Sequence, residues 1–129
     1  MAVTHSNAAL SAATDAVTAL IGASGKLKFR LTGTVGAPGT AVATLSLSPT
    51  AFPASTAGLA TANGITSDTN ATGNASAVAT ATLETSGGTV VIHCAVAASA
   101  SDINMTNGLT VASGDTVSCS TLTYKAISA

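Results

Sequence analysis

The sequence contains few of the side chains that bind nucleic acid or carry out chemistry. Its 129 residues include no Trp, one Tyr and two Phe, with four Lys or Arg and five Asp or Glu. Binding to phosphates needs clustered basic side chains, and binding to bases or sugars usually adds aromatic stacking. The composition therefore excludes nucleic acid as a partner, and it excludes a polybasic segment that would hold the chain on a membrane surface.

Long hydrophobic runs are also missing. Thr, Ser and Gly interrupt every apolar stretch, so none reaches the roughly 18 residues of a membrane-spanning helix. Residues 1–7 lack a basic start followed by an apolar stretch, so we expect no secretory signal. A chain that stays in a reducing cytosol keeps its cysteines reduced. We therefore expect Cys94 and Cys119 to be small buried side chains rather than a disulfide.

Small side chains make up half of the chain, because 65 of its residues are Ala, Thr or Ser. A mean hydropathy of +0.53 with a net charge of −1 excludes a disordered chain and predicts one folded domain over residues 1–129. So little charge gives weak protection against association. The composition therefore favours a subunit of an assembly.

Residues 7–21 predict a single helix. Ser6 or Asn7 can cap its first turn, and Gly22 can adopt the left-handed conformation that ends it. One face of this helix is apolar and should pack on the core. That face comprises Leu10, Ala13, Val17, Leu20 and Ile21.

After Gly25 the hydrophobic period changes from 3.6 to 2, which predicts strands. The first strand alternates strictly, with Leu27, Phe29 and Leu31 toward a core. The 50–74 segment is rich in Gly, Asn and Pro and predicts a long surface loop with a short strand near 59–65. The other expected strands cover residues 41–48, 75–84, 89–96, 102–105 and 116–125.

Short strands separated by frequent turns indicate the fold class. We expect a mainly β protein, an antiparallel β-sandwich or barrel-like sheet over residues 26–125. The N-terminal α-helix would lie across one end or one face of this sheet. Because aromatic side chains are scarce, the core must be thin and rich in Ala, and it would gain from burying more surface between subunits.

The residues that perform chemistry are too few and too scattered to predict an enzyme. The two histidines are His5 and His93, and no two of the five carboxylates lie close in the sequence. A metal site from His93, Cys119 and a carboxylate would lack any recognised ligand spacing. We expect no catalytic residue, no cofactor and no metal.

Three of the four basic residues form one stripe, Lys26, Lys28 and Arg30, on the solvent side of the first strand. Such a stripe commonly guards a strand against aggregation by keeping it solvated. The functional alternative is a docking strip for the acidic surface of a partner protein. These three residues are the candidate partner-docking site.

Several segments between residues 7 and 124 resemble a family of small virion proteins of tailed bacteriophages. Its members tend to carry aromatic and charged residues where this chain has the small residues Ser76–Ala81. The resemblance rests on the segments Asn7–Leu10, Gly25–Lys28, Ala43–Ser48, Ala51–Phe52, Ala57–Asp68, Asp102–Met105 and Val117–Thr123.

This resemblance implies a structural virion protein, and the small, weakly charged chain agrees best with a capsid decoration or cement protein. Such a protein would be made in the host cytoplasm and would bind the outer surface of the phage head, where it stabilises contacts between subunits of the major capsid protein. The resemblance also implies a homo-oligomer, commonly a trimer, and no catalytic residue. The alternatives are a tail or neck component, in the tube or tip, and a non-enzymatic receptor-binding adhesin module.

Overall fold

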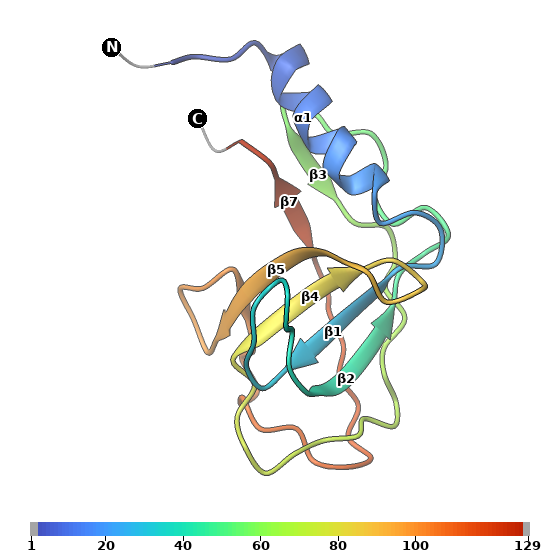
Figure 1. The fold of residues 1–129 in the computed structure, drawn as a ribbon, viewed down its shortest axis with the longest axis vertical. Helices are drawn as coiled ribbons and strands as arrows, with labels where there is room; N and C mark the ends of the chain where they lie inside the picture. The colour runs from blue at the N-terminus through green and yellow to red at the C-terminus, as the bar shows by residue number, and fades with distance from the viewer. Residues whose placement is uncertain (1–2, 128–129) are drawn as a thin grey trace.

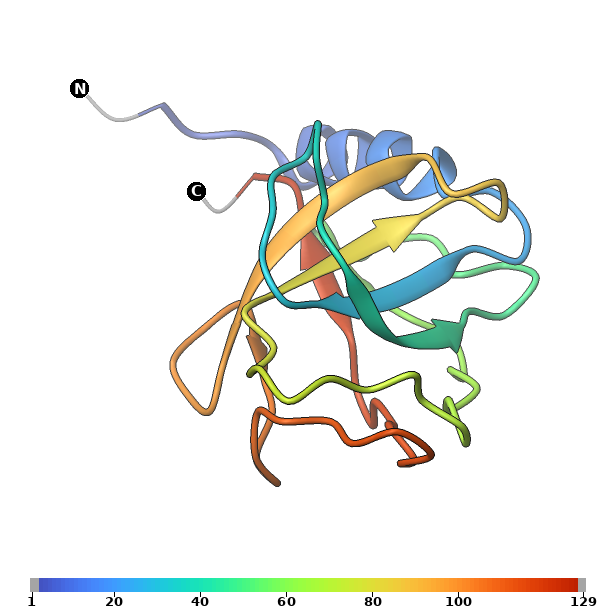
Figure 2. The same cartoon turned by 60° about the horizontal axis from the view of Figure 1, so that its bottom comes forward.

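The chain folds into a curled five-stranded sheet with a helix and a two-stranded ribbon attached at one end (Figures 1 and 2). The computed structural model describes residues 3–127. No helix in that range is long and apolar enough to cross a membrane. The elements are α1 (Asn7–Ala19), β1 (Lys26–Arg30), β2 (Ala41–Ser46), β3 (Leu59–Thr61), β4 (Thr80–Glu84), β5 (Val90–Ala97), β6 (Ile103–Asn104) and β7 (Thr123–Lys125).

The large sheet has the strand order β2-β1-β4-β5-β6, and the ribbon pairs β3 with β7. Neighbouring strands are antiparallel except β5 and β6, which run parallel over two residue pairs. The sheet curls into a half-barrel, as the two views show. The prediction of a mainly β, barrel-like fold with one N-terminal helix is confirmed, although the sheet is mixed rather than purely antiparallel.

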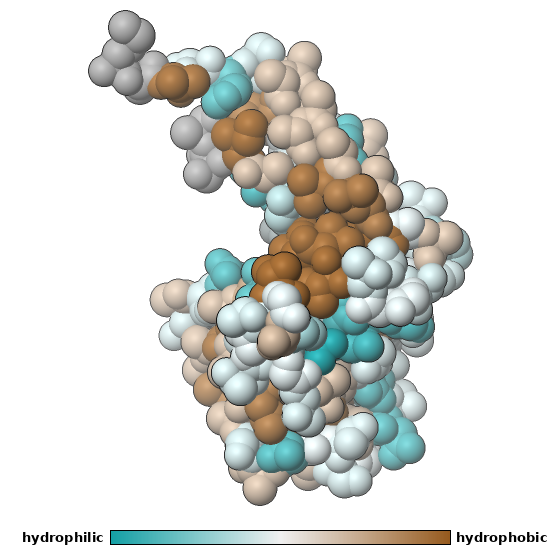
Figure 3. Space-filling view, viewed as in Figure 1, coloured by the Kyte–Doolittle hydropathy of each residue, from teal (hydrophilic) through white to brown (hydrophobic). Residues whose placement is uncertain are grey.

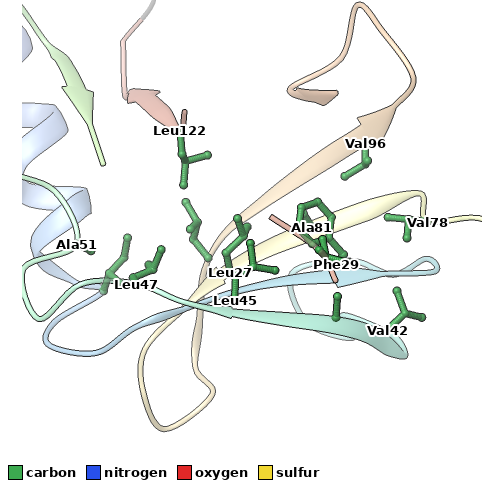
Figure 4. Close-up of a cluster of buried hydrophobic side chains, with 14 of the residues drawn as sticks. Leu27, Phe29, Val42, Leu45, Leu47, Ala51, Val78, Ala81, Val96 and Leu122 are labelled. Atoms are coloured by element: carbon green, nitrogen blue, oxygen red, sulfur yellow. The ribbon is translucent and has the colours of Figure 1, made fainter. Parts of the chain in front are cut away.

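The core lies on one face of the sheet, the inner face, which carries Leu27 and Phe29 of β1, the strand between β2 and β4. Leu27 stands opposite Leu45 of β2 and Leu83 of β4 in the strand register. Phe29 stands between two alanines, which leave room for its ring. Figure 4 shows these side chains on the side of the sheet where Leu122 also lies. The alternation predicted for β1 is therefore correct.

The 50–74 segment packs more closely than a surface loop. Ala51, Phe52, Ala60 and Ala71 are all buried in the core. The segment also hydrogen-bonds along β2, where the Thr66 and Ser46 main chains pair at 2.8 and 3.1 Å. Apart from β3, which is the short strand expected near 59–65, the segment is irregular and largely exposed. The sequence did not predict that this stretch also covers the outer edge of the sheet and supplies small side chains to the core.

The last expected strand, 116–125, is much shorter in the structure. Only β7 is regular, and residues 116–122 run irregularly across the open side of the half-barrel. There Val117 and Leu122 are buried, and the Leu122 carbonyl accepts a hydrogen bond of 2.8 Å from Ala62. Residues 116–122 therefore form no continuous β-ladder. They cover the open side of the core with single buried side chains, Val117 and Leu122, at irregular spacing.

The helix begins as predicted and packs most of its predicted inner face inward, because Leu10 and Ile21 are buried and Ala13 and Val17 are half-buried. The Ser6 hydroxyl accepts a hydrogen bond from the Ala9 main chain, and Gly22 follows the helix with a φ of 69°. Thr14 and Thr18 are buried, whereas Leu20 is 65% exposed. Only the expected inward position of Leu20 is wrong, and the inner face also includes Thr14, whose hydroxyl is hydrogen-bonded.

Those hydrogen bonds join the helix to the ribbon and its flanks. The Thr14 hydroxyl donates to the Gly58 carbonyl at 2.5 Å and accepts from the Ala126 main chain at 3.1 Å. Gly58 has a φ of 83°, and a Cβ there would lie 2.8 Å from that of Leu10. The close approach of helix and backbone therefore requires glycine at this position.

Candidate functional site

The predicted basic stripe lies on the outer face of the sheet, the face opposite the core. Lys26, Lys28 and Arg30 alternate along β1 as expected, with Thr82 and Glu84 on β4 beside them. The loop between β1 and β2 folds back over this face, as Figure 2 shows. The stripe is therefore partly covered by the protein's own chain rather than fully solvated.

Arg30 is the most enclosed member, with 7% of its surface exposed. Its Nη2 donates to Glu84 Oε2 at 2.7 Å, and its Nε donates to the Thr82 hydroxyl at 3.0 Å. Its Nη1 donates to the Gly39 carbonyl in the covering loop at 2.5 Å. Arg30 therefore fastens the loop to the sheet, and the expectation that it faces water is wrong.

Glu84 is the centre of this arrangement, which we call the ion cluster: Lys28, Arg30, Thr82 and Glu84. It is 1% exposed, and its Oε1 lies 3.3 Å from the Lys28 Nζ. Its Oε2 accepts hydrogen bonds from Arg30 and Thr82. One buried carboxylate thus neutralises two cations from the neighbouring strand.

The environment of Glu84 favours its ionised form. Burial by itself raises the pKa of Glu84. The hydrogen bonds from Arg30 and Thr82 and the positive charges of Lys28 and Arg30 act in the opposite direction and dominate. The pKa of Glu84 is therefore lowered from its ordinary value of 4.5.

Both partners of the buried pair sit at irregularities in the sheet. The register between β1 and β2 shifts at Phe29 and Arg30, and that between β4 and β5 shifts at Leu83 and Glu84. Such bulges redirect side chains and increase the local twist. They coincide with the curl of the sheet and with the place where the ion cluster forms.

The ion cluster joins β1, β4 and the loop between β1 and β2, so fewer basic side chains remain available for docking a partner. Lys28 keeps 25% of its side chain exposed, and Lys26 is half-buried with its Nζ donating to Ser46 at 3.0 Å. A docking strip on this strand therefore consists of Lys26 and Lys28 alone. Glu84 was not selected from the sequence as a site residue. The only hint of its role in the sequence is that it is the single Glu of the chain and stands at the end of an expected strand.

The remaining groups that could perform chemistry stay apart. In the described range, no group of three His, Cys, Asp or Glu side chains could hold a metal ion. Asp68 accepts main-chain hydrogen bonds from Thr44 and Asn70, and Asp102 accepts one from Ala95. These two carboxylates therefore stabilise the local backbone by accepting main-chain hydrogen bonds.

Both cysteines are free in the structure. Burial raises the pKa of the Cys94 thiol to about 11, and the charge of Asp102 adds to this. Burial also raises the pKa of Cys119, which donates a hydrogen bond to the Thr121 carbonyl. Both thiols are therefore kept protonated and poorly nucleophilic.

The surface of the described residues is indented by clefts, two of which are lined in part by acidic side chains. The larger has a volume of about 530 Å³ and is lined by Phe29 and by much of the stretch 102–123. The smaller, of about 420 Å³, lies between α1 and residues 49–54. Each contains acidic side chains, Asp102 and Asp115 in the first and Asp15 in the second. Each of the three already accepts a main-chain hydrogen bond.

In comparisons with known proteins, no family model, no curated protein and no solved structure matches this chain.

Proposed function

We propose that this chain is a structural virion protein, a capsid decoration protein that binds the outer surface of a phage head and stabilises contacts between major capsid subunits. The sequence resemblance over residues 7–124 supports the proposal, as does the low charge of the chain. The observation in the structure that carries it is the distribution of apolar side chains on the surface.

Large apolar side chains are exposed on four separate segments. They are Val3 before α1, Leu20 after it, Val35 in the loop between β1 and β2, and Leu59 of β3, with exposed fractions of 74, 65, 60 and 47%. Figure 3 shows a continuous hydrophobic area over the end of α1, over β5 and over the tip of that loop. Patches of this kind usually mark sites of protein interaction.

A decoration protein of this kind would act mainly by burying apolar surface against the capsid. Apolar surface removed from water stabilises by about 25 cal/mol per Å², and a stable interface covers about 800 Å² on each partner. Lys26 and Lys28, which keep part of their side chains exposed on the outer face of the sheet, would add attraction to an acidic capsid surface. Repeated over many capsid subunits, such contacts would hold the shell against internal pressure.

Mass spectrometry of separated heads and tails tests the location. The proposal expects the chain in heads, and recovery only with tails would overturn it in favour of a tail or neck component. Binding of glycans by the isolated protein would instead favour an adhesin.

Binding of the purified protein to heads that lack it tests the surface. The double variant Leu20→Gln with Val35→Gln should bind at least about tenfold more weakly, because two exposed apolar anchors are lost. The matched control is Thr72→Gln, an exposed residue of the segment between β3 and β4, which extends to the end of the molecule opposite α1 (Figure 1). Equal affinity of the double variant and the wild type would show that this face is not the one that binds.

A further inference from the structure

Two Asn-Gly pairs occur in the sequence, Asn63-Gly64 and Asn107-Gly108, and asparagine is one of the chemically labile residues. In its deamidation the main-chain nitrogen of the next residue attacks the side-chain amide carbon, and glycine hinders this attack least because it has no Cβ. Both asparagines are exposed, and a Cβ built on either glycine would meet no atom within 4 Å. Crowding therefore does not distinguish the two pairs.

Hydrogen bonds hold both the side chain and the backbone of Asn63. Its Nδ2 donates to the Thr50 carbonyl at 2.7 Å, and its main-chain N–H donates to the Ala51 carbonyl at 2.9 Å. The Gly64 carbonyl accepts from the Ser48 hydroxyl at 2.5 Å. Bringing the amide carbon of Asn63 onto the nitrogen of Gly64 would break the bond to Thr50 and move a backbone that is anchored on both sides.

The turn that contains Asn107 lacks such anchors. The nearest main-chain hydrogen bonds lie on either side of it, at Met105 and at Leu109, with lengths of 2.9 and 2.8 Å. Between them, residues 106–108 belong to no strand and form no hydrogen bond with another main-chain group of residues 3–127. The main-chain nitrogen of Gly108 is therefore not held back from the amide carbon of Asn107.

We propose that Asn107 is a site of spontaneous deamidation, whereas the fold protects Asn63. The nitrogen of Gly108 forms a bond to the side-chain amide carbon of Asn107 and gives up its proton, and the amide nitrogen takes up a proton and leaves as ammonia. Water then opens the cyclic imide at one of its two carbonyls, which produces aspartate or isoaspartate at this position. One water is consumed and one ammonia is released, so the reaction needs no oxidant, cofactor or enzyme.

This modification would change the charge of the larger cleft. Asn107 and Gly108 line that cleft together with Asp102 and Asp115. The new carboxyl group is ionised at neutral pH because its ordinary pKa is about 4, so the net charge of the chain changes from −1 to −2. Isoaspartate also adds one atom to the main chain just before Leu109, which packs against the core. The protein therefore becomes a mixture of two charge forms as it ages.

A protease that cuts after Glu separates the two sites, because the single Glu of the chain, Glu84, lies between them. The folded protein is incubated at mildly alkaline pH, which promotes loss of the Gly108 proton, and is then digested and weighed by mass spectrometry. Fragment 85–129 should gain the mass of about 1 Da that exchanging NH₂ for OH adds. It should do so at least about tenfold faster than fragment 1–84, and an assay for isoaspartate should be positive in the same fragment.

Two matched variants assign the reaction to its residue. Asn107→Gln should abolish the mass gain of fragment 85–129, because the longer side chain closes a larger ring much more slowly. Asn63→Gln makes the same change at the protected pair and should leave that gain unaltered. In guanidinium chloride the protection of Asn63 is lost with the fold, so both wild-type fragments should gain mass at similar rates. Circular dichroism before digestion shows that each variant is folded.

Three outcomes would refute the proposal. The first is equal rates for the two fragments of the folded protein, and the second is a gain in fragment 85–129 that survives Asn107→Gln. The third is a difference between the fragments that persists in guanidinium chloride, since the local sequence rather than the fold would then set the rates. None of these results bears on the proposed role on a capsid, because the experiment uses the isolated chain.

Discussion

The substitution Glu84→Gln is the sharpest test of the ion cluster. It keeps the shape of the side chain and removes its negative charge, so Arg30 remains enclosed without a counterion. Lys28 also loses its partner, but it can turn toward water because a quarter of its side chain is exposed. The energetic effect therefore comes mainly from Arg30.

The expected loss follows from the geometry. At 2.7 Å the pair of Arg30 and Glu84 attracts with about 6 kcal/mol at an effective dielectric constant near 20. Much of this is offset by the desolvation of both groups, and breaking a buried pair by removing one partner typically costs about 3–5 kcal/mol. For a chain of this length the midpoint of thermal unfolding should fall by about 10–20 °C.

Urea unfolding followed by far-ultraviolet circular dichroism measures this loss. Asp115→Asn is the matched control, because Asp115 is exposed and Asn can still accept the hydrogen bond from Ala112. It should change the unfolding free energy by about 0.5 kcal/mol or less. Adding Arg30→Met to Glu84→Gln should recover part of the loss, since no unpaired charge remains. A loss below about 1 kcal/mol for Glu84→Gln would refute the reasoning.

The same pair predicts a dependence on pH. The pKa of Glu84 is lower in the folded than in the unfolded chain, so its contribution is fully present above the ordinary pKa of 4.5. It is lost as the pH falls through the folded pKa. The difference in stability between the wild type and Glu84→Gln should therefore be constant near neutrality and shrink below pH 4.5. A difference that stays constant in acid would contradict the assignment.

Three further outcomes are expected. Thr14→Val should lower the unfolding free energy by about 2–4 kcal/mol in urea titrations, because two main-chain groups lose their partner; the exposed Thr4→Val should not, and similar values for the two would show that Thr14 does not join helix and ribbon. Gly58→Ala should cost about 1–3 kcal/mol, whereas Gly64→Ala, with open space around it, should cost little. In the Cys119→Ala variant at pH 8, the Cys94 thiol should react with a disulfide reagent about 100-fold more slowly in the folded state than in urea; equal rates would contradict its raised pKa.

The strands were predictable where alternation is strict and one face is buried. β1 matches its expected range closely because its apolar residues recur every second position, and β5 does so because it is a short, almost wholly apolar run rich in β-branched residues and preceded by a Gly-containing turn. The stretch 116–122 alternates too, yet it forms no regular strand, because its neighbours in space are loops rather than another strand. Periodicity predicts which side chains turn inward, whereas a ladder also needs a partner strand.

The orientation of the helix shows the same limit. Leu20 was expected in the core, and Thr14 was not. The hydrogen-bond partners of Thr14 are the Gly58 carbonyl and the Ala126 N–H, which are 44 and 112 residues away from it in the chain. Only the tertiary fold brings them to one face of the helix.

The sequence by itself determined the class of the protein: a mainly β domain with a capped N-terminal helix, a thin core of Ala, Leu and Val, and a weakly charged surface. These properties follow from composition and local periodicity, which depend on neighbours in the chain. Only the tertiary structure decided that Arg30 meets Glu84 instead of water, and that the 50–74 segment covers the edge of the sheet along β2. The physical reason is that pairing of charges and of sheet edges depends on segments that are distant in the sequence and meet only when the sheet curls.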